Sequence, residues 1–175
     1  FGRLDGRSLF NVETGEIGEV RLTGRKIVLE ELIRNFPKLS EALPVELGFS
    51  GLSDFDLSLR GTLEYLGLHG NCNFTPAVLT FGQIFSKPKD FPFGVHFDFL
   101  LKKGNLLRGD FSLRIRQTTV KGSLVDLDLK TGEGELTLIT NKFDLEGWNQ
   151  LVIPFSGCTL QGAAKILVNW KGNLT

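Results

Sequence analysis

Histidine is the side chain that most often acts as a general base or a metal ligand near neutral pH, and the chain contains two, His69 and His96. His96 falls on the polar side of an expected strand, and His69 lies beside Gly70 in an expected turn. They stand apart in the sequence, and neither belongs to a recognisable catalytic or zinc-binding pattern. We interpret both as solvated surface residues.

Two pairs of carboxylates alternate along expected strands, Asp54 with Asp56 and Asp126 with Asp128. Two carboxylates on one strand face could hold a hard cation, which prefers oxygen ligands. No flanking loop supplies the remaining ligands, so we interpret both pairs as solvated charges. The sequence contains no Gly-x-Ser-x-Gly, P-loop or dinucleotide-binding motif. It therefore predicts no catalytic residue, metal site or cofactor. A hydrolase would require a pocket with a perturbed base, which no motif supplies.

The composition limits the partners. The 20 basic and 20 acidic residues are scattered and balance to a net charge of zero, which argues against nucleic acid. No apolar run approaches the roughly 18–20 residues of a membrane-spanning helix. Cys72 and Cys158 permit one disulfide but do not imply one. The chain contains no Met, so we expect residues 1–175 to be a piece of a longer protein.

The pattern of apolar and polar residues is typical of β-strands. Apolar and polar residues alternate over 55–61, 93–100, 111–117, 123–130 and 134–140, with Gly-containing turn signals between several of these segments. Strict alternation is typical of antiparallel strands with one buried and one wet face. The sequence therefore predicts a mainly β fold, a curved antiparallel meander. The apolar positions of these segments are Phe55, Leu57, Leu59, Phe93, Val95, Phe97, Phe99, Phe111, Leu113, Ile115, Val125, Leu127, Leu129, Leu136 and Leu138.

One or two short helices are expected beside these strands. Leu29, Leu32, Ile33 and Phe36 recur at helical spacing, in a region that ends at Pro44. A weaker helical stripe falls on 143–152, where Gly147 is unfavourable. Residues 76–90 are expected to form a strand through Thr80 and Phe81 followed by a Pro-containing loop.

Two blocks of the sequence recur in the same order. Residues 18–30, "GEVRLTGRKIVLE", match 134–146, "GELTLITNKFDLE". Residues 51–63, "GLSDFDLSLRGTL", match 162–174, "GAAKILVNWKGNL". Conserved strands around a connection of variable length are typical of a repeated supersecondary unit. We expect one full unit over about 8–122 and the first half of the next over about 123–175.

The arrangement resembles the AsmA family, large periplasmic proteins of Gram-negative bacteria that include TamB-like members. The stretches that carry the resemblance are "GRLDGRSLFNVETGEIGEVRLTGRKIVLEELI", "LPVELGFSGLSDFDLSLRGTLEYLGLHGNCNF", "SKPKDFPFGVHFDF" and "RIRQTTVKGSLVDL". It implies an elongated β-structure in the periplasm, anchored in the inner membrane by a helix of the parent protein. It also implies an apolar groove that helps to move phospholipid between the inner and outer membranes.

The resemblance implies that the apolar face of the sheet contacts lipid. Phospholipid acyl chains would be the partner, with envelope proteins as a further class. Two alternatives remain open: the same face as a closed core, or a structural β-repeat module that binds proteins through its sheet edges. The residues expected to contact acyl chains are Phe55, Leu57, Leu59, Phe93, Val95, Phe97, Phe99, Phe111, Leu113 and Ile115.

Overall fold

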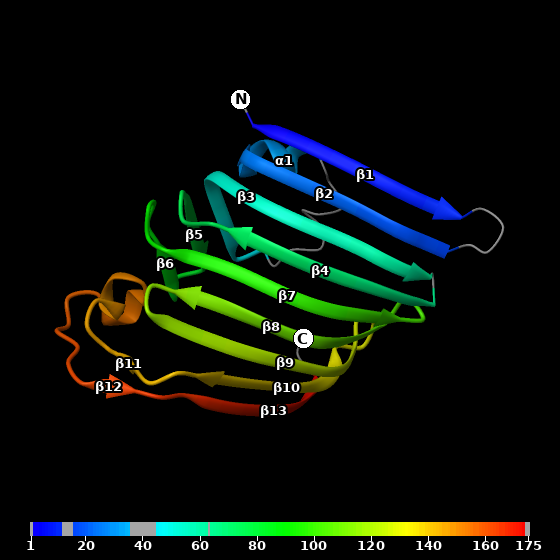
Figure 1. Cartoon of the computed structure of the whole chain (residues 1–175). Helices are drawn as coiled ribbons and strands as arrows, with labels where there is room; N and C mark the ends of the chain where they lie inside the picture. Colours follow the sequence, from blue (N-terminus) through cyan, green and yellow to red (C-terminus); the bar gives the residue numbers. More distant parts are fainter. Residues whose placement is uncertain (1, 12–15, 36–44, 63, 174–175) are drawn as a thin grey trace.

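In the computed structural model, which describes residues 2–11, 16–35, 45–62 and 64–173, the chain forms one large, curved antiparallel sheet (Figure 1). Successive strands lie side by side, as expected for a meander, and the predicted mainly β fold is confirmed. In spatial order the strands are β1 (Arg3–Asn11), β2 (Glu16–Val28), β3 (Leu47–Thr62), β4 (Tyr65–Asn73), β7 (Phe93–Lys102), β8 (Leu106–Ile115), β9 (Thr118–Asp128), β10 (Glu133–Thr140) and β13 (Leu167–Asn173).

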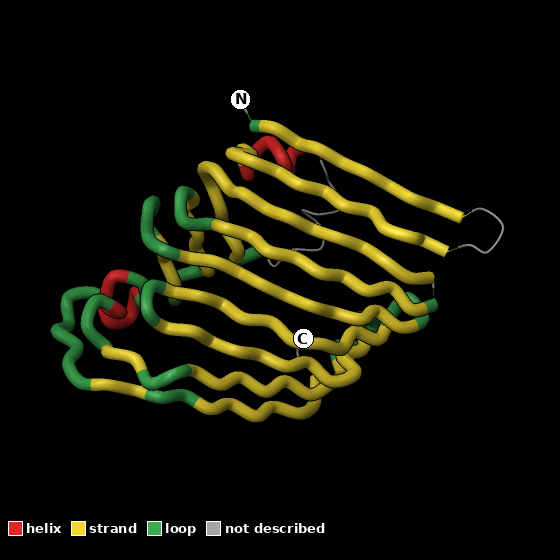
Figure 2. Tube along the Cα trace, viewed as in Figure 1, coloured by secondary structure: helices red, strands yellow, loops and turns green. Residues whose placement is uncertain are grey.

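The shorter elements gather along one rim of this sheet (Figure 2). Helix α1 (Leu29–Asn35) follows β2, and a hairpin of β5 (Ala77–Phe81) and β6 (Phe85–Lys87) lies between β4 and β7 in the sequence. Farther along the rim are β11 (Phe143–Asp144), β12 (Ala163–Ala164) and two 3-10 turns. The turns are η1 (Trp148–Gln150) and η2 (Ile153–Phe155).

The two helix predictions fared differently. The stripe beginning at Leu29 does form a helix, with Glu30 and Glu31 in its first turn, where acidic groups are favourable; the expected continuation over 36–44 lies outside the described residues. The prediction of a second helix over 143–152 was wrong. Phe143 pairs with Ala164 in a short strand, and Gly147 adopts the left-handed region at φ 83°, so only 3-10 turns follow.

The pairing register separates an apolar face from a polar one. Strand residues directly opposite one another lie on the same face. One row across the sheet contains Leu22, Leu57, Gly70, Phe97, Phe111, Gly122, Leu138 and Val168. The adjacent row contains Arg21, Ser58, His69, Asp98, Asp110, Ser123, Thr137 and Asn169. The predicted division into an apolar and a polar face therefore holds along these two rows, from β2 to β13.

One bulge overturns part of the predicted alternation. Between β8 and β9 the register shifts, so that Gly109 pairs with Leu124 while Leu107 pairs with Leu127. The extra residue on β9 places Leu124 and Leu127 on the apolar face and leaves Val125, opposite Glu135, exposed. The prediction that Val125 and Leu127 share a face was therefore wrong. Bulges of this kind increase local twist and help a sheet to curve.

Three glycines on the apolar face are each covered by an aromatic ring from the strand beside them. Gly24 is paired with Phe55, Gly70 with Phe97, and Gly122 with Phe111. A Cβ added at these glycines would lie 2.5, 2.3 and 2.1 Å from the Cζ atom of the respective ring. Each ring therefore occupies the space that a Cβ on its partner would need, an arrangement in which aromatic residues compensate for glycine in strands.

The two matched sequence blocks pair with the same register. Leu22 pairs with Leu57 in the first block, and their counterparts, Leu138 and Val168, pair in the second. The hairpin β1–β2 likewise corresponds to β9–β10: Gly6 is opposite Leu22, as Gly122 is opposite Leu138. Counterpart glycines also share a positive φ, 127° at Gly61 and 139° at Gly172. The sequence similarity thus coincides with a repeated pairing pattern.

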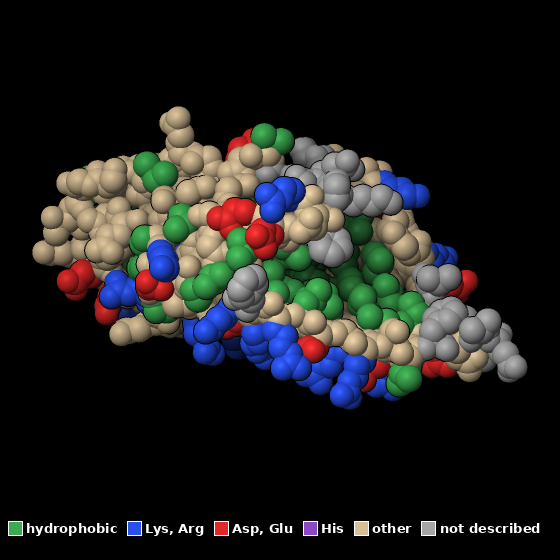
Figure 3. Space-filling view, turned by 90° about the horizontal axis from the view of Figure 1, so that it is seen from above, with side chains coloured by type: hydrophobic (Ala, Val, Ile, Leu, Met, Phe, Trp, Pro, Cys, Tyr) green, Lys and Arg blue, Asp and Glu red, His purple; other side chains and the backbone are tan. Residues whose placement is uncertain are grey.

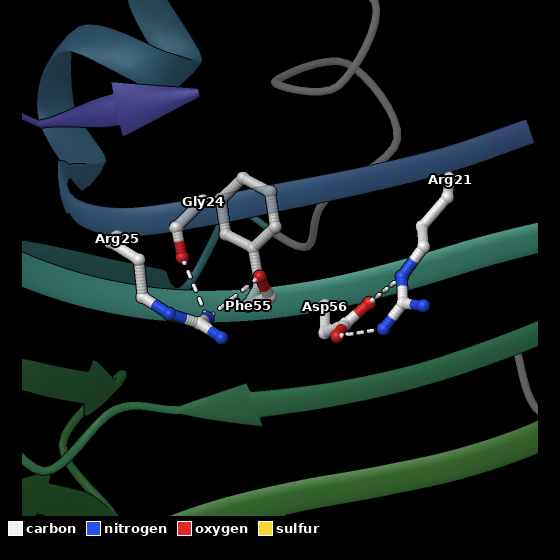
Figure 4. Close-up of polar contacts among 5 residues, drawn as sticks. All are labelled: Arg21, Gly24, Arg25, Phe55 and Asp56. Atoms are coloured by element: carbon white, nitrogen blue, oxygen red, sulfur yellow. Dashed lines mark hydrogen bonds and ion pairs between the residues drawn. The ribbon is translucent and has the colours of Figure 1, made fainter. Parts of the chain in front are cut away.

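On the polar face, side chains form polar contacts between neighbouring strands, as Figure 4 shows for β2 and β3. Arg21 donates from Nε and Nη2 to the Asp56 carboxylate at 3.1 and 2.7 Å, and Arg25 donates to the carbonyl oxygens of Gly24 and Phe55 (Figure 4). The hydrogen bond from Arg21 lowers the pKa of Asp56 below its ordinary value.

This pair predicts a pH dependence. Because the pKa of Asp56 is lower in the folded chain, the stabilisation is present above about pH 4 and is lost as the pH falls through the folded value. Arg21→Gln should remove it. In urea unfolding at several pH values, the difference between wild type and Arg21→Gln should be constant from pH 5 to 8 and shrink below pH 4. A difference that grows on acidification would contradict the assignment.

No helix within the described residues is long and apolar enough to cross a membrane.

Candidate functional site

A cavity of about 1010 Å³ lies against the apolar face, at the end of the sheet where α1 and the β5–β6 hairpin are attached. Figure 3 shows hydrophobic side chains gathered in this hollow, whereas Lys and Arg side chains line the outer side of the molecule. None of the described lining residues is charged. The lining comprises Leu22, Leu29, Leu32, Ile33, Asn35, Leu47, Phe49, Ser53, Phe55, Leu57, Cys72, Phe74, Leu79, Thr80, Phe85, Phe93 and Phe97.

The hydroxyl groups in this lining are already engaged with the backbone. Ser53 Oγ donates to the carbonyl oxygens of Asn73 and Asp54 at 3.2 and 3.4 Å. Thr80 Oγ1 donates to the carbonyl oxygen of Gly48 at 3.4 Å. A hydroxyl that already donates to a backbone carbonyl oxygen has no strong need of a ligand partner. Apart from the exposed Asn35, the described lining therefore suits hydrocarbon and offers little recognition of a polar group.

The side of the cavity opposite the main sheet, here called the roof, consists of α1, residues 47–51 of β3 and the β5–β6 hairpin, and it depends on a bend in β3. Its first residues, from Leu47 to Gly51, pair with β5, whereas the rest of the strand pairs with β2 and β4. Gly51 has φ 95°, and its N–H donates to the Glu30 carboxylate at 3.0 Å, which ties the bend to α1. Leu29 of α1 then packs against Ala77 and Leu79 of β5. A strand that changes sheets at a glycine thus lifts the roof away from the main sheet.

The rim beyond the roof is filled. Leu151, which follows η1, is buried against Phe91 and Ile115. Phe85 and Phe93 contact both this cluster and the cluster of Leu29, Ala77 and Leu79 in the roof, so the two clusters are contiguous. The apolar face is consequently covered along this rim and remains half-exposed farther along β7, β8 and β9.

The ten residues expected to contact lipid occupy one face of β3, β7 and β8, because their register pairs them with one another or with apolar-face residues of β4 and β9. Phe55, Leu57, Phe93 and Phe97 line the cavity. Ile115 is instead part of the filled rim and is only 7% exposed. The rest lie half-buried on the face beyond the cavity: Leu59, Val95, Phe99, Phe111 and Leu113.

Several lining residues were not among the predicted ones. Leu22 follows the same alternation as Val20 and was within reach of sequence pattern alone. Leu29, Leu32 and Ile33 were recognised as the stripe of a helix, but nothing local says which surface a helix covers. Phe49, Leu79 and Phe85 line the cavity only because β3 bends and β5 pairs with it, which is a non-local event.

Three of the four acids in these pairs have structural partners. Asp54 Oδ1 accepts the N–H of Lys26 at 2.8 Å, and Asp56 is paired with Arg21. Asp128 accepts the backbone N–H groups of Lys130 and Thr131, which lower its pKa. Asp128 is therefore a turn-forming residue, and the interpretation of these acids as merely solvated was incomplete.

The histidines are also closer than the sequence suggested. His69 lies within β4 and not in a turn, and its ring is 5.0 Å from that of His96 on the polar face. His96 Nδ1 lies 2.9 Å from Asn71 Oδ1. Among the residues that the structure describes, no group of three or more His, Cys, Asp or Glu side chains is arranged to hold a metal ion.

Both cysteines are free thiols, and Cys72 lies in the cavity wall. Burial raises the pKa of the Cys72 thiol, which lowers its thiolate fraction, whereas Cys158 is exposed. We expect iodoacetamide at pH 8 to modify Cys158 about tenfold faster than Cys72, because the thiolate is the nucleophile. Peptide mapping by mass spectrometry measures both rates in one sample. Equal rates would show that Cys72 is not shielded.

Comparison with protein-family models, curated proteins and solved structures found no match to this chain.

Proposed function

We propose that this protein is a non-enzymatic, AsmA-like segment whose apolar groove holds phospholipid acyl chains during transport between the inner and outer membranes. The observation that carries the proposal is the cavity of about 1010 Å³, whose described lining is uncharged and which is continuous with the apolar face of the curved sheet. The periplasmic location and the membrane-anchored parent are part of the same proposal and rest on the sequence resemblance.

The energetics suit a conduit. Burying a methylene group contributes about 0.8 kcal/mol, so an acyl chain is retained by area alone. Since the hydroxyls of Ser53 and Thr80 donate to backbone carbonyl oxygens, they offer an acyl chain no directional contact. A ligand that is held without directional bonds slides with little change in energy. The charged headgroup would remain outside, because an unpaired charge is costly to bury.

A binding experiment tests this proposal. A phospholipid with a fluorescent nitrobenzoxadiazole group on its acyl chain should brighten when it enters the apolar groove. Unlabelled phosphatidylglycerol, phosphatidylethanolamine and palmitate should all displace it, since recognition depends on the chain and not on the headgroup. Displacement by only one headgroup class, or no brightening at all, would contradict the proposed mode of binding.

Two variants locate the binding. Leu57→Trp keeps the lining apolar but occupies space in the cavity, so it should reduce the amount of bound lipid without removing apolar surface. Ser112→Asp adds a charge to the polar face, opposite Lys121, and should leave binding unchanged. Bound lipid should also slow the alkylation of Cys72 and not that of Cys158. Equal effects of the two substitutions would place the lipid elsewhere.

A structural module that binds proteins through its sheet edges is the second candidate. It is favoured by one observation: within the described residues β1 and β13 each have a neighbour on one side only. Edge strands carry unpaired backbone groups that readily accept another strand. This function would not require an occupied groove, so the lipid experiments above separate the two candidates.

A further inference from the structure

The two histidines lie on the polar face, away from the groove, at diagonal positions of the adjacent strands β4 and β7. His69 is opposite Asp98 and His96 is opposite Asn71, and the centroids of the two imidazole rings are 5.0 Å apart. Because metal–nitrogen bonds are about 2.0–2.1 Å long, two imidazoles on one tetrahedral ion have ring centroids roughly 5 Å apart. The two rings therefore have the spacing of a pair of ligands to a single ion.

Each ring also has one nitrogen turned to an oxygen atom of the residue opposite. His96 Nδ1 lies 2.9 Å from Asn71 Oδ1, and because an amide oxygen only accepts, the ring donates from Nδ1. His69 Nδ1 lies 4.0 Å from the Asp98 carboxylate, which favours a proton on that nitrogen. Both imidazoles thus present Nε2 as the nitrogen with a lone pair. Support of Nδ1 by a carboxylate or carbonyl oxygen is typical of histidines that bind metals.

The neighbouring charges favour a cation at this place. Asp98 is directly opposite Asp110 of β8, and like charges in that arrangement repel one another. Among the described residues, no Lys or Arg forms a salt bridge with either carboxylate. A divalent ion beside Asp98 would offset this repulsion.

We infer that His69 and His96 bind one divalent ion of a late first-row transition metal through their Nε2 atoms. Imidazole nitrogen suits copper, nickel and zinc, whereas magnesium and calcium prefer oxygen ligands. Asp98 and Asn71 orient the two rings, and water completes the coordination. With two protein ligands on an exposed strand face, the ion remains exchangeable.

Isothermal titration calorimetry in a non-chelating buffer measures the binding. The starting protein is Cys158→Ser, because the exposed Cys158 thiol is another donor for soft ions. Cu²⁺ should bind at one ion per chain and more tightly than Ni²⁺, as the general order of metal affinities requires. Mg²⁺ should not bind at the same concentrations. Electron paramagnetic resonance of the Cu²⁺ complex should show splitting from two nitrogen ligands.

Four substitutions in this protein locate the ion. His69→Gln and His96→Gln should each weaken Cu²⁺ binding at least roughly tenfold and leave one nitrogen ligand in the resonance spectrum. Asp98→Asn should weaken it about tenfold, since it removes the partner that orients His69. Asp126→Asn removes the same charge from β9 and should leave binding unchanged. All four side chains are exposed, so the variants should fold, which circular dichroism checks.

Loss of affinity in both histidine variants, with Asp126→Asn unchanged, supports the inference. Absence of Cu²⁺ binding, wild-type affinity in either histidine variant, or a spectrum without nitrogen splitting would each overturn it. An equal loss in Asp98→Asn and Asp126→Asn would overturn the role given to Asp98, because it would reduce that role to overall charge. None of these results depends on lipid in the groove.

Discussion

Gly109→Ala should destabilise the protein by roughly 3–5 kcal/mol, among the largest effects expected of a single substitution. Gly109 has φ 141°, a region that is essentially reserved for glycine. An added Cβ would also lie 2.1 Å from the Asp98 carbonyl oxygen and 2.8 Å from Phe99 Cα. Both contacts are with the backbone of β7, so relief requires moving a strand. Denaturant unfolding monitored by tryptophan fluorescence measures the loss.

Gly104→Ala is the control. Gly104 also has a positive φ, 73°, but it lies in the turn between β7 and β8, and no heavy atom comes within 4 Å of an added Cβ. Only the conformational cost of about 1–2 kcal/mol should remain. Equal losses for Gly104→Ala and Gly109→Ala would show that the close approach of β7 and β8 at the bulge is not what requires glycine.

Lys87→Met should be the next most damaging change, costing roughly 2–3 kcal/mol. Lys87 is fully buried in β6, where its ammonium donates to the carbonyl oxygens of Thr75 at 3.1 Å, Pro88 at 2.9 Å and Ala77. The turn from β4 into β5 is thereby fixed to the end of β6. Methionine fills a similar volume but leaves these oxygens without that donor. Because this turn supports the roof, lipid binding should fall as well.

The pH dependence identifies the ammonium. Burial lowers the pKa of Lys87, and Asp90 opposes this shift. The Lys87 amine therefore binds its proton more tightly in the unfolded chain than in the folded one. As a result, the contribution of Lys87 to the free energy of unfolding grows as the pH rises from the lowered pKa of the folded chain to the ordinary pKa of 10.5. The deficit of Lys87→Met relative to wild type should widen over that range. The exposed neighbour Lys89 supplies the control, and Lys89→Met should be near neutral. A deficit that narrows at high pH would contradict this account.

The sequence predicted the parts of the fold that depend on local pattern. Alternation identified the apolar face of β3, β7 and β8, because the side-chain period of a strand is independent of its neighbours. It failed at Val125, where a bulge inserts one residue and shifts the faces. It also placed His69 in a turn, since Gly70 reads as a turn signal although it lies in β4.

The cavity could not be predicted from local sequence pattern. Its lower wall contains the predicted Phe55, Leu57 and Phe97, but its roof depends on the bend of β3 at Gly51 and on the pairing of that segment with β5. Glycine in a strand signals a bend or a bulge without giving its direction. The repeated register, in contrast, was visible in the sequence as two matched blocks and reappears as equivalent pairing in the structure.

Mass spectrometry of an organic extract from the purified protein tests directly whether the groove holds phospholipid. Wild type, Phe97→Asp and Ser112→Asp are compared, with folding verified by circular dichroism. Phe97 lines the cavity, and Ser112 lies on the polar face of the neighbouring strand. Wild type and Ser112→Asp should yield phospholipid, and Phe97→Asp should yield only background amounts. Equal phospholipid in all three proteins, or none in the wild type, would contradict the groove as a lipid site.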